Sequence, residues 1–400
     1  MFRFSGPRRA GSHPELRILA LALGLGTAAA CGGGDSQSPG NQEEPATVGC
    51  KDGTLAATGA LYRVCFPASW NGDLVVYAHG YVAADAPLAV PDDQIDGQSI
   101  AQVVNGQGYA YATTSYRANG LVADEAVEDV AQLVDEVRRR FTPDPARAFV
   151  VGVSEGGLVA ALAAERRPDL FKAALAACGP VGDFAGQIDY LGDFRVLFDY
   201  FFPGVIPGGP VTVPDTVRAQ WSSVFAPKVA AALQADGQAT LELLTVSGAP
   251  HAAPDLPLAS TTALEILWYD IYALPDAQQR LGGQPYDNIG RVYQGSSDDG
   301  ALNAGVVRVA ADAAARAGLA GFETTGALTV PVGTLHTTGD PVVPAAQETI
   351  YADKVSAHGA AGLLDQQTPD RYGHCTFTGL EVLQAFAAVT GRAAAARRID

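Results

Sequence analysis

The sequence predicts an α/β fold with a mostly parallel central sheet, helices on both faces and a large, mainly helical insertion. Three observations support this prediction. Short apolar runs alternate with amphipathic segments of helical period, and the links between them are short. The alternation breaks at about residue 182 and resumes near residue 327. Of the 400 residues, 48% are hydrophobic and 17% charged, which is enough for a large core and excludes a disordered chain.

The elements of this sheet are identified by their apolar patterns. Strands covered on both faces read as short continuous apolar runs, whereas helices lying on a sheet repeat apolar residues every three or four positions. In chain order, we expect strands at 61–66, 74–78, 108–114, 148–152, 171–177 and 328–335. We expect helices at 99–104, 122–141, 156–165, 344–358 and 378–391, with a polar loop at 82–97.

Residues 182–326 interrupt this pattern. The segment is rich in aromatic residues and proline, is mostly helical by periodicity and is too long for a loop. We interpret it as a cap inserted into a domain whose two parts are 49–181 and 327–400. Its aromatic residues at 194–202 and at Trp268-Tyr269 are candidates for a pocket lining, and most of the others are expected to form the cap's own core.

The N-terminus has the features of an export signal. Residues 1–30 carry four arginines and then an apolar run that is too short to cross a bilayer as a helix. Small residues followed by Cys31 resemble a bacterial lipobox, in which this cysteine is acylated, although Ala28 stands where such boxes prefer leucine. Ala28 and Ala30 also fit ordinary signal peptidase. Because residues 31–48 form a flexible polar tether, we expect a lipoprotein anchored at the cell envelope, or a secreted protein if Cys31 is not lipidated.

Charge and cysteine content restrict the partners. The formal charge of −17 opposes contact with nucleic acid and with anionic lipid headgroups, so we expect a membrane contact only through the lipid anchor. The chain has five cysteines and no C-x-x-C spacing, which argues against a structural zinc site, and we expect no metal. If Cys31 carries lipid, four cysteines remain and can form two pairs.

A candidate nucleophile lies between a predicted strand and a predicted helix. Gly152-Val153-Ser154-Glu155-Gly156 matches the G-x-S-x-G pattern of a nucleophile elbow, in which glycines flank the serine because a Cβ atom there would clash with the crossing backbone. A serine hydroxyl needs a base, and the base needs an orienting carboxylate. Asp340 follows the strand that resumes after the insertion, and His374 lies 34 residues further on.

Together, His79-Gly80 after the first buried strand, the Ser154 elbow, Asp340 and His374 resemble the α/β-hydrolase superfamily over about residues 60–181 and 327–392. The resemblance implies a Ser154–His374–Asp340 triad, an acyl-enzyme mechanism and no cofactor. It also implies an oxyanion hole formed by the backbone N–H groups of Tyr81 and Glu155. We expect the Glu155 side chain itself to lie at the solvent edge.

The cysteines add a weaker resemblance. Cys375 directly follows the candidate base, as in the tannase and feruloyl-esterase group, but there the partner cysteine directly precedes the nucleophile, where this chain has Val153. Cys178 ends the strand after the elbow helix, at the same edge of the sheet, so we predict a Cys178–Cys375 bridge. Cys50 and Cys65 lie 15 residues apart across a predicted turn and form the second predicted pair. The alternative is four reduced, buried thiols.

These features predict an exported serine hydrolase that cleaves carboxylic esters, with a small-molecule or polymeric ester as substrate. One alternative is a serine peptidase of the prolyl-oligopeptidase type acting on short peptides, since it would carry the same triad. An alternative of another class is a non-catalytic surface-binding protein on a hydrolase scaffold. The acyl chain length and the oligomeric state do not follow from the sequence.

Overall fold

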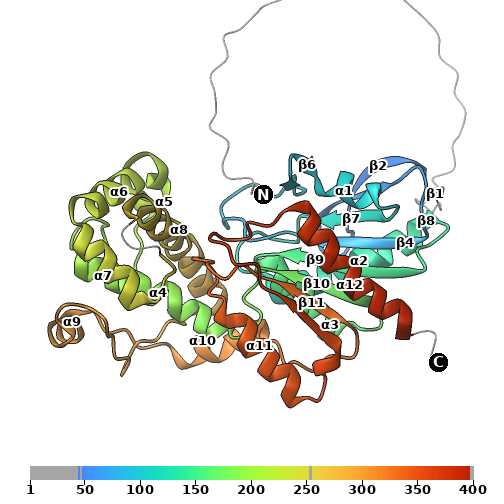
Figure 1. Ribbon diagram of the computed structural model, residues 1–400. Coiled ribbons are helices and arrows are strands. Elements are labelled where there is room, and N and C mark those ends of the chain that lie inside the picture. Colours follow the sequence, from blue (N-terminus) through green and yellow to red (C-terminus); the bar gives the residue numbers. More distant parts are fainter. Residues whose placement is uncertain (1–43, 46, 252–254, 397–400) are drawn as a thin grey trace, which may run out of the picture.

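The computed structural model describes residues 44–45, 47–251 and 255–396 (Figure 1). The predicted signal peptide, Cys31 and most of the predicted tether lie outside the described residues. Within these residues, no helix combines the length and the apolar character that a membrane span requires.

A central eight-stranded sheet confirms the predicted α/β fold, with strand order β12-β11-β10-β9-β4-β7-β3-β2. Neighbouring strands from β12 to β7 pair in parallel, whereas β3 runs antiparallel to both of its neighbours. The strands are β2 (Gly49–Thr54), β3 (Leu61–Phe66), β4 (Asp73–Ala78), β7 (Ala110–Thr114), β9 (Arg147–Val153), β10 (Phe171–Ala177), β11 (Val332–Leu335) and β12 (Leu364–Gln367). Two short pairs lie outside this sheet: β1 (Glu44–Pro45) with β8 (Phe141–Thr142), and β5 (Gln94–Ile95) with β6 (Gln98–Ser99).

Helices cover both faces of the sheet (Figure 1). The helices of one face are α1 (Ile100–Gly106) and α12 (Gly379–Ala396), and those of the other are α2 (Ala123–Arg140), α3 (Glu155–Arg166) and α11 (Ala346–Ala357). In α2 the periodic apolar residues predicted from the sequence are buried, acidic residues occupy the first turn and three arginines the last, as the helix dipole favours. Because β10 and α3 are rich in alanine, this helix can pack closely on the sheet.

The segment between β10 and β11 is mainly helical and packs chiefly on itself. Its elements are α4 (Phe184–Phe201), α5 (Asp215–Ala219), a π-helix (Trp221–Phe225), α6 (Ala226–Ala235), α7 (Gly237–Ser247), α8 (Leu256–Leu281), α9 (Asp299–Gly305), α10 (Ala313–Gly318) and a 3₁₀-helix (Leu319–Phe322). Helices α4, α6, α7 and α10 all pack against α8 or one another, to one side of the sheet (Figure 1). Buried Arg195 of α4 pairs with Asp199 and with Asp270 of α8, at 2.9 and 3.2 Å. We call this segment the insertion.

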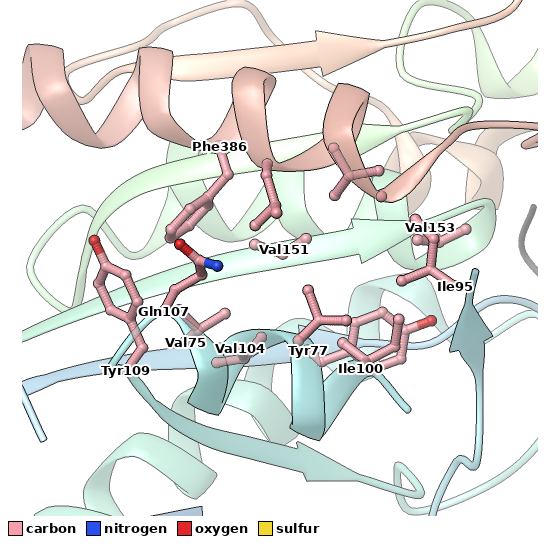
Figure 2. A pocket seen from close by; sticks show the side chains of 14 residues that line it. Val75, Tyr77, Ile95, Ile100, Val104, Gln107, Tyr109, Val151, Val153 and Phe386 are labelled. Atoms are coloured by element: carbon pink, nitrogen blue, oxygen red, sulfur yellow. The ribbon is translucent and has the colours of Figure 1, made fainter. Parts of the chain in front are cut away.

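An apolar cavity lies between α1 and α12, against β4 and β9 (Figure 2). Figure 2 shows Ile100 and Val104 of α1 on one side and Phe386 of α12 on the other, with Val75 and Val151 of the sheet between them. None of the predicted site residues lines this cavity. It lies on one face of the sheet, separate from the edge where the candidate site lies.

Candidate active site

Ser154 sits at the turn between β9 and α3, as the elbow pattern predicts. Its backbone adopts φ 60° and ψ −125°, a region that a serine enters only when the surrounding structure holds it there. Its N–H donates to the Ala177 carbonyl of β10 at 2.9 Å. The turn thus lifts the hydroxyl off the carboxyl end of the sheet while the backbone stays tied to the neighbouring strand.

The flanking glycines are required by close backbone approach. A Cβ atom on Gly152 would lie 1.7 Å from the Gly156 carbonyl oxygen, and one on Gly156 would lie 2.1 Å from the Ala78 carbonyl oxygen at the end of β4. Both contacts are with backbone, which cannot rotate away as a flexible side chain would. The elbow therefore tolerates only glycine at these two positions.

The structure brings Ser154, His374 and Asp340 together. His374 Nε2 lies 2.8 Å from Ser154 Oγ, and His374 Nδ1 lies 2.7 Å from Asp340 Oδ2. Asp340 is fully buried, and its other oxygen accepts hydrogen bonds from the N–H groups of Val342 and Val343 at 2.9 and 3.0 Å. This carboxylate is therefore fixed in place and leaves one oxygen for the imidazole.

The loop that carries His374 is held to the loop that carries Asp340. The Gly373 N–H donates to the Gly339 carbonyl at 3.0 Å, and the Thr337 hydroxyl donates to the Gly373 carbonyl at 2.7 Å. A second histidine, His336, lies 3.5 Å from Asp340, but its Nε2 also lies 2.9 Å from the Val343 carbonyl. His374 is thus the imidazole that links the acid to the serine.

Both predicted disulfides are present. Cys178 and Cys375 are joined, with their Cα atoms 5.4 Å apart, and Cys50 and Cys65 are joined across β2 and β3. Cys178 and Cys375 are fully buried, and both have positive φ, 47° and 54°. The bridge between them anchors the residue next to His374 to the end of β10. Ligand atoms of Cys178, His374 and Cys375 lie within 4.8 Å of one another, but the two sulfurs are bonded to each other.

The residues predicted to form the oxyanion hole are Tyr81 and Glu155. Tyr81 and Glu155 line the same cavity as Ser154, and within the described ranges no hydrogen bond occupies either backbone N–H. His79 does not point a nitrogen at the serine: its ring stacks on Tyr116, with centroids 4.0 Å apart, and its Nδ1 lies 2.7 Å from the Gly80 carbonyl. Burial lowers the pKa of His79, so it acts as a neutral support for this turn.

The expectation that the Glu155 side chain lies at the solvent edge is wrong. The side chain is 5% exposed and points under the elbow toward α2. The N–H groups of Val122 and Ala123, at the start of α2, donate to it, the first at 2.7 Å. The pKa of Glu155 is raised to about 8, chiefly by burial and also by nearby Asp276, although these hydrogen bonds act to lower it. Glu155 therefore ties the elbow to the N-terminus of α2.

The cavity at Ser154 is walled largely by the insertion. Its apolar lining comes from α4, α8, the loop after Asp340 and the loops that precede α2 and α4, and consists of Leu121, Pro180, Phe184, Ile188, Leu191, Ala273, Val342 and Val343. Of the predicted pocket candidates, Tyr269 lines this cavity, whereas Phe194 and Phe198 are buried in the core of the insertion. Amphipathic periodicity predicts which residues of a helix are buried, but not that α4 meets the Asp340 loop.

Two α4 side chains hold that loop. The Gln187 amide donates to the Val342 carbonyl at 2.8 Å, and the Tyr190 hydroxyl donates to the Pro341 carbonyl at 2.7 Å. On α8, Glu265 has one carboxylate oxygen that is buried and finds no hydrogen-bond partner among the described residues. Burial raises the pKa of Glu265, while His374 opposes the rise. Sequence reasoning identified none of these three residues, because their roles depend on how the insertion docks.

One known family matches part of the chain. Residues 98–187, under a quarter of the chain and including the elbow, match the prolyl oligopeptidase family. A search of curated proteins finds no match.

Similar solved structures include an esterase from Aspergillus oryzae, with 11% identity and a TM-score of 0.48, covering 80% of this chain and 71% of that one. Feruloyl esterase B from the same organism has 13% identity and a TM-score of 0.45, with 80% and 71% coverage. A puromycin-hydrolyzing peptidase from Mycobacterium tuberculosis has 13% identity and a TM-score of 0.43, covering 85% of this chain and 39% of that one.

Proposed function

Because the chain has the fold and the residue order of a serine hydrolase of the α/β-hydrolase superfamily, we propose that it cleaves carboxylic esters through an acyl-enzyme on Ser154. The observation that carries this proposal is the unbroken hydrogen-bonded chain from Ser154 Oγ through His374 to Asp340, at 2.8 and 2.7 Å. Both distances lie within the range for proton transfer between positioned groups.

In the proposed reaction, Ser154 Oγ attacks the carbonyl carbon while His374 Nε2 takes the hydroxyl proton. Buried Asp340 holds the imidazole and stabilises its protonated form. When the tetrahedral intermediate collapses, His374 gives this proton to the leaving alcohol. Water then attacks the acyl-enzyme by the same route, which releases the carboxylic acid and regenerates Ser154.

The negative charge on the carbonyl oxygen develops beside the elbow. We propose that the N–H groups of Glu155 and Tyr81 bind this oxyanion. Glu155 lies at the first position of α3, so the helix dipole favours the same charge. One such donor contributes about 10²–10³-fold to kcat.

An apolar acyl group suits the cavity. Eight of its lining residues have aliphatic or aromatic side chains without a polar group, from Leu121 to Val343. Such walls gain free energy from an alkyl or aryl group and give a charged one no partner. This supports an ester with an apolar acyl group as the substrate class.

The direct test is hydrolysis of p-nitrophenyl esters of increasing acyl length by the purified protein and by Ser154→Ala. We expect the variant to lose several orders of magnitude in kcat, and we expect longer acyl groups to lower KM until the cavity is full. If the wild-type protein hydrolyses no ester, a fluorophosphonate probe should be applied to both samples. Labelling of neither would refute catalysis and favour a binding protein on a hydrolase scaffold.

A second candidate is a serine peptidase acting on short peptides. The match of residues 98–187 to the prolyl oligopeptidase family favours it. The same samples decide between the two: fluorophosphonate labelling of the wild type alone, with no ester turnover but with cleavage of short peptide amides, would replace the esterase proposal by this one.

We also propose that the protein is exported and anchored through Cys31. The support is the predicted signal and the pairing of the other four cysteines, since disulfides persist in oxidising compartments. Mass spectrometry of the mature N-terminal peptide is the test. Acyl groups on Cys31 that disappear in Cys31→Ser would support the anchor, whereas an unmodified N-terminus would favour the secreted form.

A further inference from the structure

A second histidine lies against the candidate acid. His336 directly follows β11 and is fully buried, as Asp340 is. Its Nε2 lies 3.5 Å from Asp340 Oδ2, the same oxygen that His374 Nδ1 approaches at 2.7 Å. One carboxylate oxygen is therefore shared between two imidazoles, of which only His374 takes part in the reaction proposed above.

Both ring nitrogens of His336 face oxygen atoms that accept hydrogen bonds. Nδ1 lies 3.2 Å from Glu348 Oε1, and Nε2 lies 2.9 Å from the Val343 carbonyl oxygen. A neutral imidazole has one N–H group and would turn a lone pair toward one of these oxygens, whereas an imidazolium donates on both sides. Although burial acts to lower the pKa of His336, its hydrogen bond with Glu348 and the charge of Asp340 raise this pKa overall.

Glu348 is held in the orientation that faces His336. Its Oε2 accepts hydrogen bonds from the Thr334 hydroxyl of β11 and from the Gln366 side-chain amide of β12, the second at 2.7 Å. These two donors leave Oε1 for the imidazole. Among the described residues, the ion pairs of Glu348 and Asp340 are with histidines and include no lysine or arginine.

The other elements packed around His336 bring neutral groups to it. Strand β12 contributes the Gln367 carbonyl, which accepts the backbone N–H of His336 at 2.9 Å. At the end of β10, Cys178 is part of a disulfide and does not titrate. Helix α4 reaches the acid loop through Gln187 and Tyr190, and burial holds the pKa of Tyr190 well above its usual value. The two carboxylates therefore set the charge of this ring.

We propose that His336 is a positioning residue, an imidazolium clamped between Glu348 and the acid loop that serves as the buried counter-charge of Asp340. This inference rests on the proposed function. A carboxylate buried without a cation is costly, and two of them side by side are more so. His336 keeps both of its protons throughout the reaction, so the only proton that moves still travels between Ser154, His374 and the leaving group.

The counter-charge has a consequence for the base. A buried carboxylate favours the protonated form of the imidazole that it faces, and a protonated His374 cannot accept the serine proton. A positive charge on the other side of Asp340 weakens this preference. His336 would therefore keep His374 in its working, unprotonated form down to a lower pH than Asp340 alone would allow.

The charge of His336 can be measured without an activity assay. We would record ¹⁵N NMR spectra of the full chain with labelled histidine, and assign the His336 signals by their loss in His336→Asn or their displacement in Glu348→Gln. We expect both ring nitrogens of His336 to carry a proton over the whole pH range in which the protein is folded. An unprotonated ring nitrogen in this range would overturn the inference.

The pH dependence of kcat/KM tests the positioning role. His336→Asn removes the charge and the Nε2–H group but keeps an N–H group near the position of Nδ1. On a p-nitrophenyl ester, we expect the acid limb of the profile to move to higher pH by about one unit, with most of the activity regained at alkaline pH. The matched control is His358→Asn, which removes an exposed histidine at the end of α11 and should leave the acid limb where it is in the wild type.

A merely structural role predicts a different result. Looser packing in His336→Asn would lower kcat/KM at every pH and leave the position of the acid limb unchanged, and this outcome would refute the inference. The proposed function would still stand if Ser154→Ala is inactive. If Ser154→Ala remains active, the proposed function fails, and the positioning role of His336 fails with it.

Discussion

Removal of the Cys178–Cys375 bridge should cost more stability than removal of Cys50–Cys65, and it alone should reduce activity. The two bridges close loops of very different size, with sequence separations of 197 and 15 residues. In the chain-entropy description, loops of these lengths correspond to about 5 and about 3 kcal/mol of unfolding free energy. The double alanine variants of the two pairs therefore differ by about 2 kcal/mol in predicted stability.

The effect on activity comes from position rather than from loop length. Cys375 directly follows His374, and its backbone has a φ of 54°, which a non-glycine residue adopts only under constraint. Without the bridge, the loop keeps the Gly373–Gly339 hydrogen bond and the Thr337 contact. The residue after His374 would, however, no longer be anchored to the end of β10. We expect the added freedom of His374 to lower kcat at least tenfold, because a displacement of about 1 Å at a catalytic group lowers the rate about 10²-fold.

Urea unfolding followed by circular dichroism measures the stability of each variant, and p-nitrophenyl ester hydrolysis measures kcat at a temperature where both remain folded. The Cys50/Cys65 variant is the matched control, and its kcat should stay within twofold of the wild type. A Cys178/Cys375 variant that is folded and has wild-type kcat would refute the claim that the bridge positions His374. Equal losses of stability in both variants would refute the loop-length argument.

Three further predictions concern the elbow and the acid. Burial raises the pKa of Glu155 from 4.5 to about 8, so the folded state binds this proton more tightly than the unfolded state and loses stability as pH rises from 4.5 to 8. In urea unfolding, Glu155→Gln should therefore be more stable than the wild type by on the order of 1–5 kcal/mol at pH 8, and by little at pH 4.5. The control is Glu128→Gln at an exposed position, which should show no such trend. Gly156→Ala should lower the free energy of unfolding by about 1–3 kcal/mol and abolish ester hydrolysis. The control is Gly106→Ala, which has open space around its Cβ position and should leave stability and activity intact. A fully active Gly156→Ala would show that the elbow can shift. Asp340→Asn should lower kcat about 10⁴-fold at unchanged KM, and a loss under tenfold would remove the acid from the mechanism.

The sequence predicted several inner strands of the sheet closely because most of their residues are apolar and buried. The predicted strands 61–66 and 171–177 coincide with β3 and β10, and 74–78 differs from β4 by one residue. The edge strands β2 and β12 are polar and partly exposed, so they carry little apolar signal, and β2 was not predicted. The predicted strand 328–335 is shorter in the structure and begins at Val332, just after Pro331, which lacks an N–H.

The residues of the candidate site also differ in how well the sequence predicts them. Ser154, Asp340 and His374 follow from local pattern and chain order, because strand ends of a parallel sheet meet at one edge. The burial of Glu155 depends on where the start of α2 lies, and the place of Tyr269 in the cavity beside Ser154 depends on how the insertion docks. No periodicity within either segment encodes those long-range contacts.

The Cys50–Cys65 bridge also has a mechanical consequence. Strand β2 is an edge strand of the central sheet, and a pull on the N-terminus that has separated the short β1–β8 pair reaches this sheet at its first residue pair, Gly49 with Phe66. Such a force would separate an ordinary edge strand from its neighbour by breaking their hydrogen bonds one after another. The second pair is the covalent one, so peeling stops there and the load passes to β3, which is hydrogen-bonded to a strand on each side. The domain can therefore be held by its N-terminus without the sheet being opened from that edge.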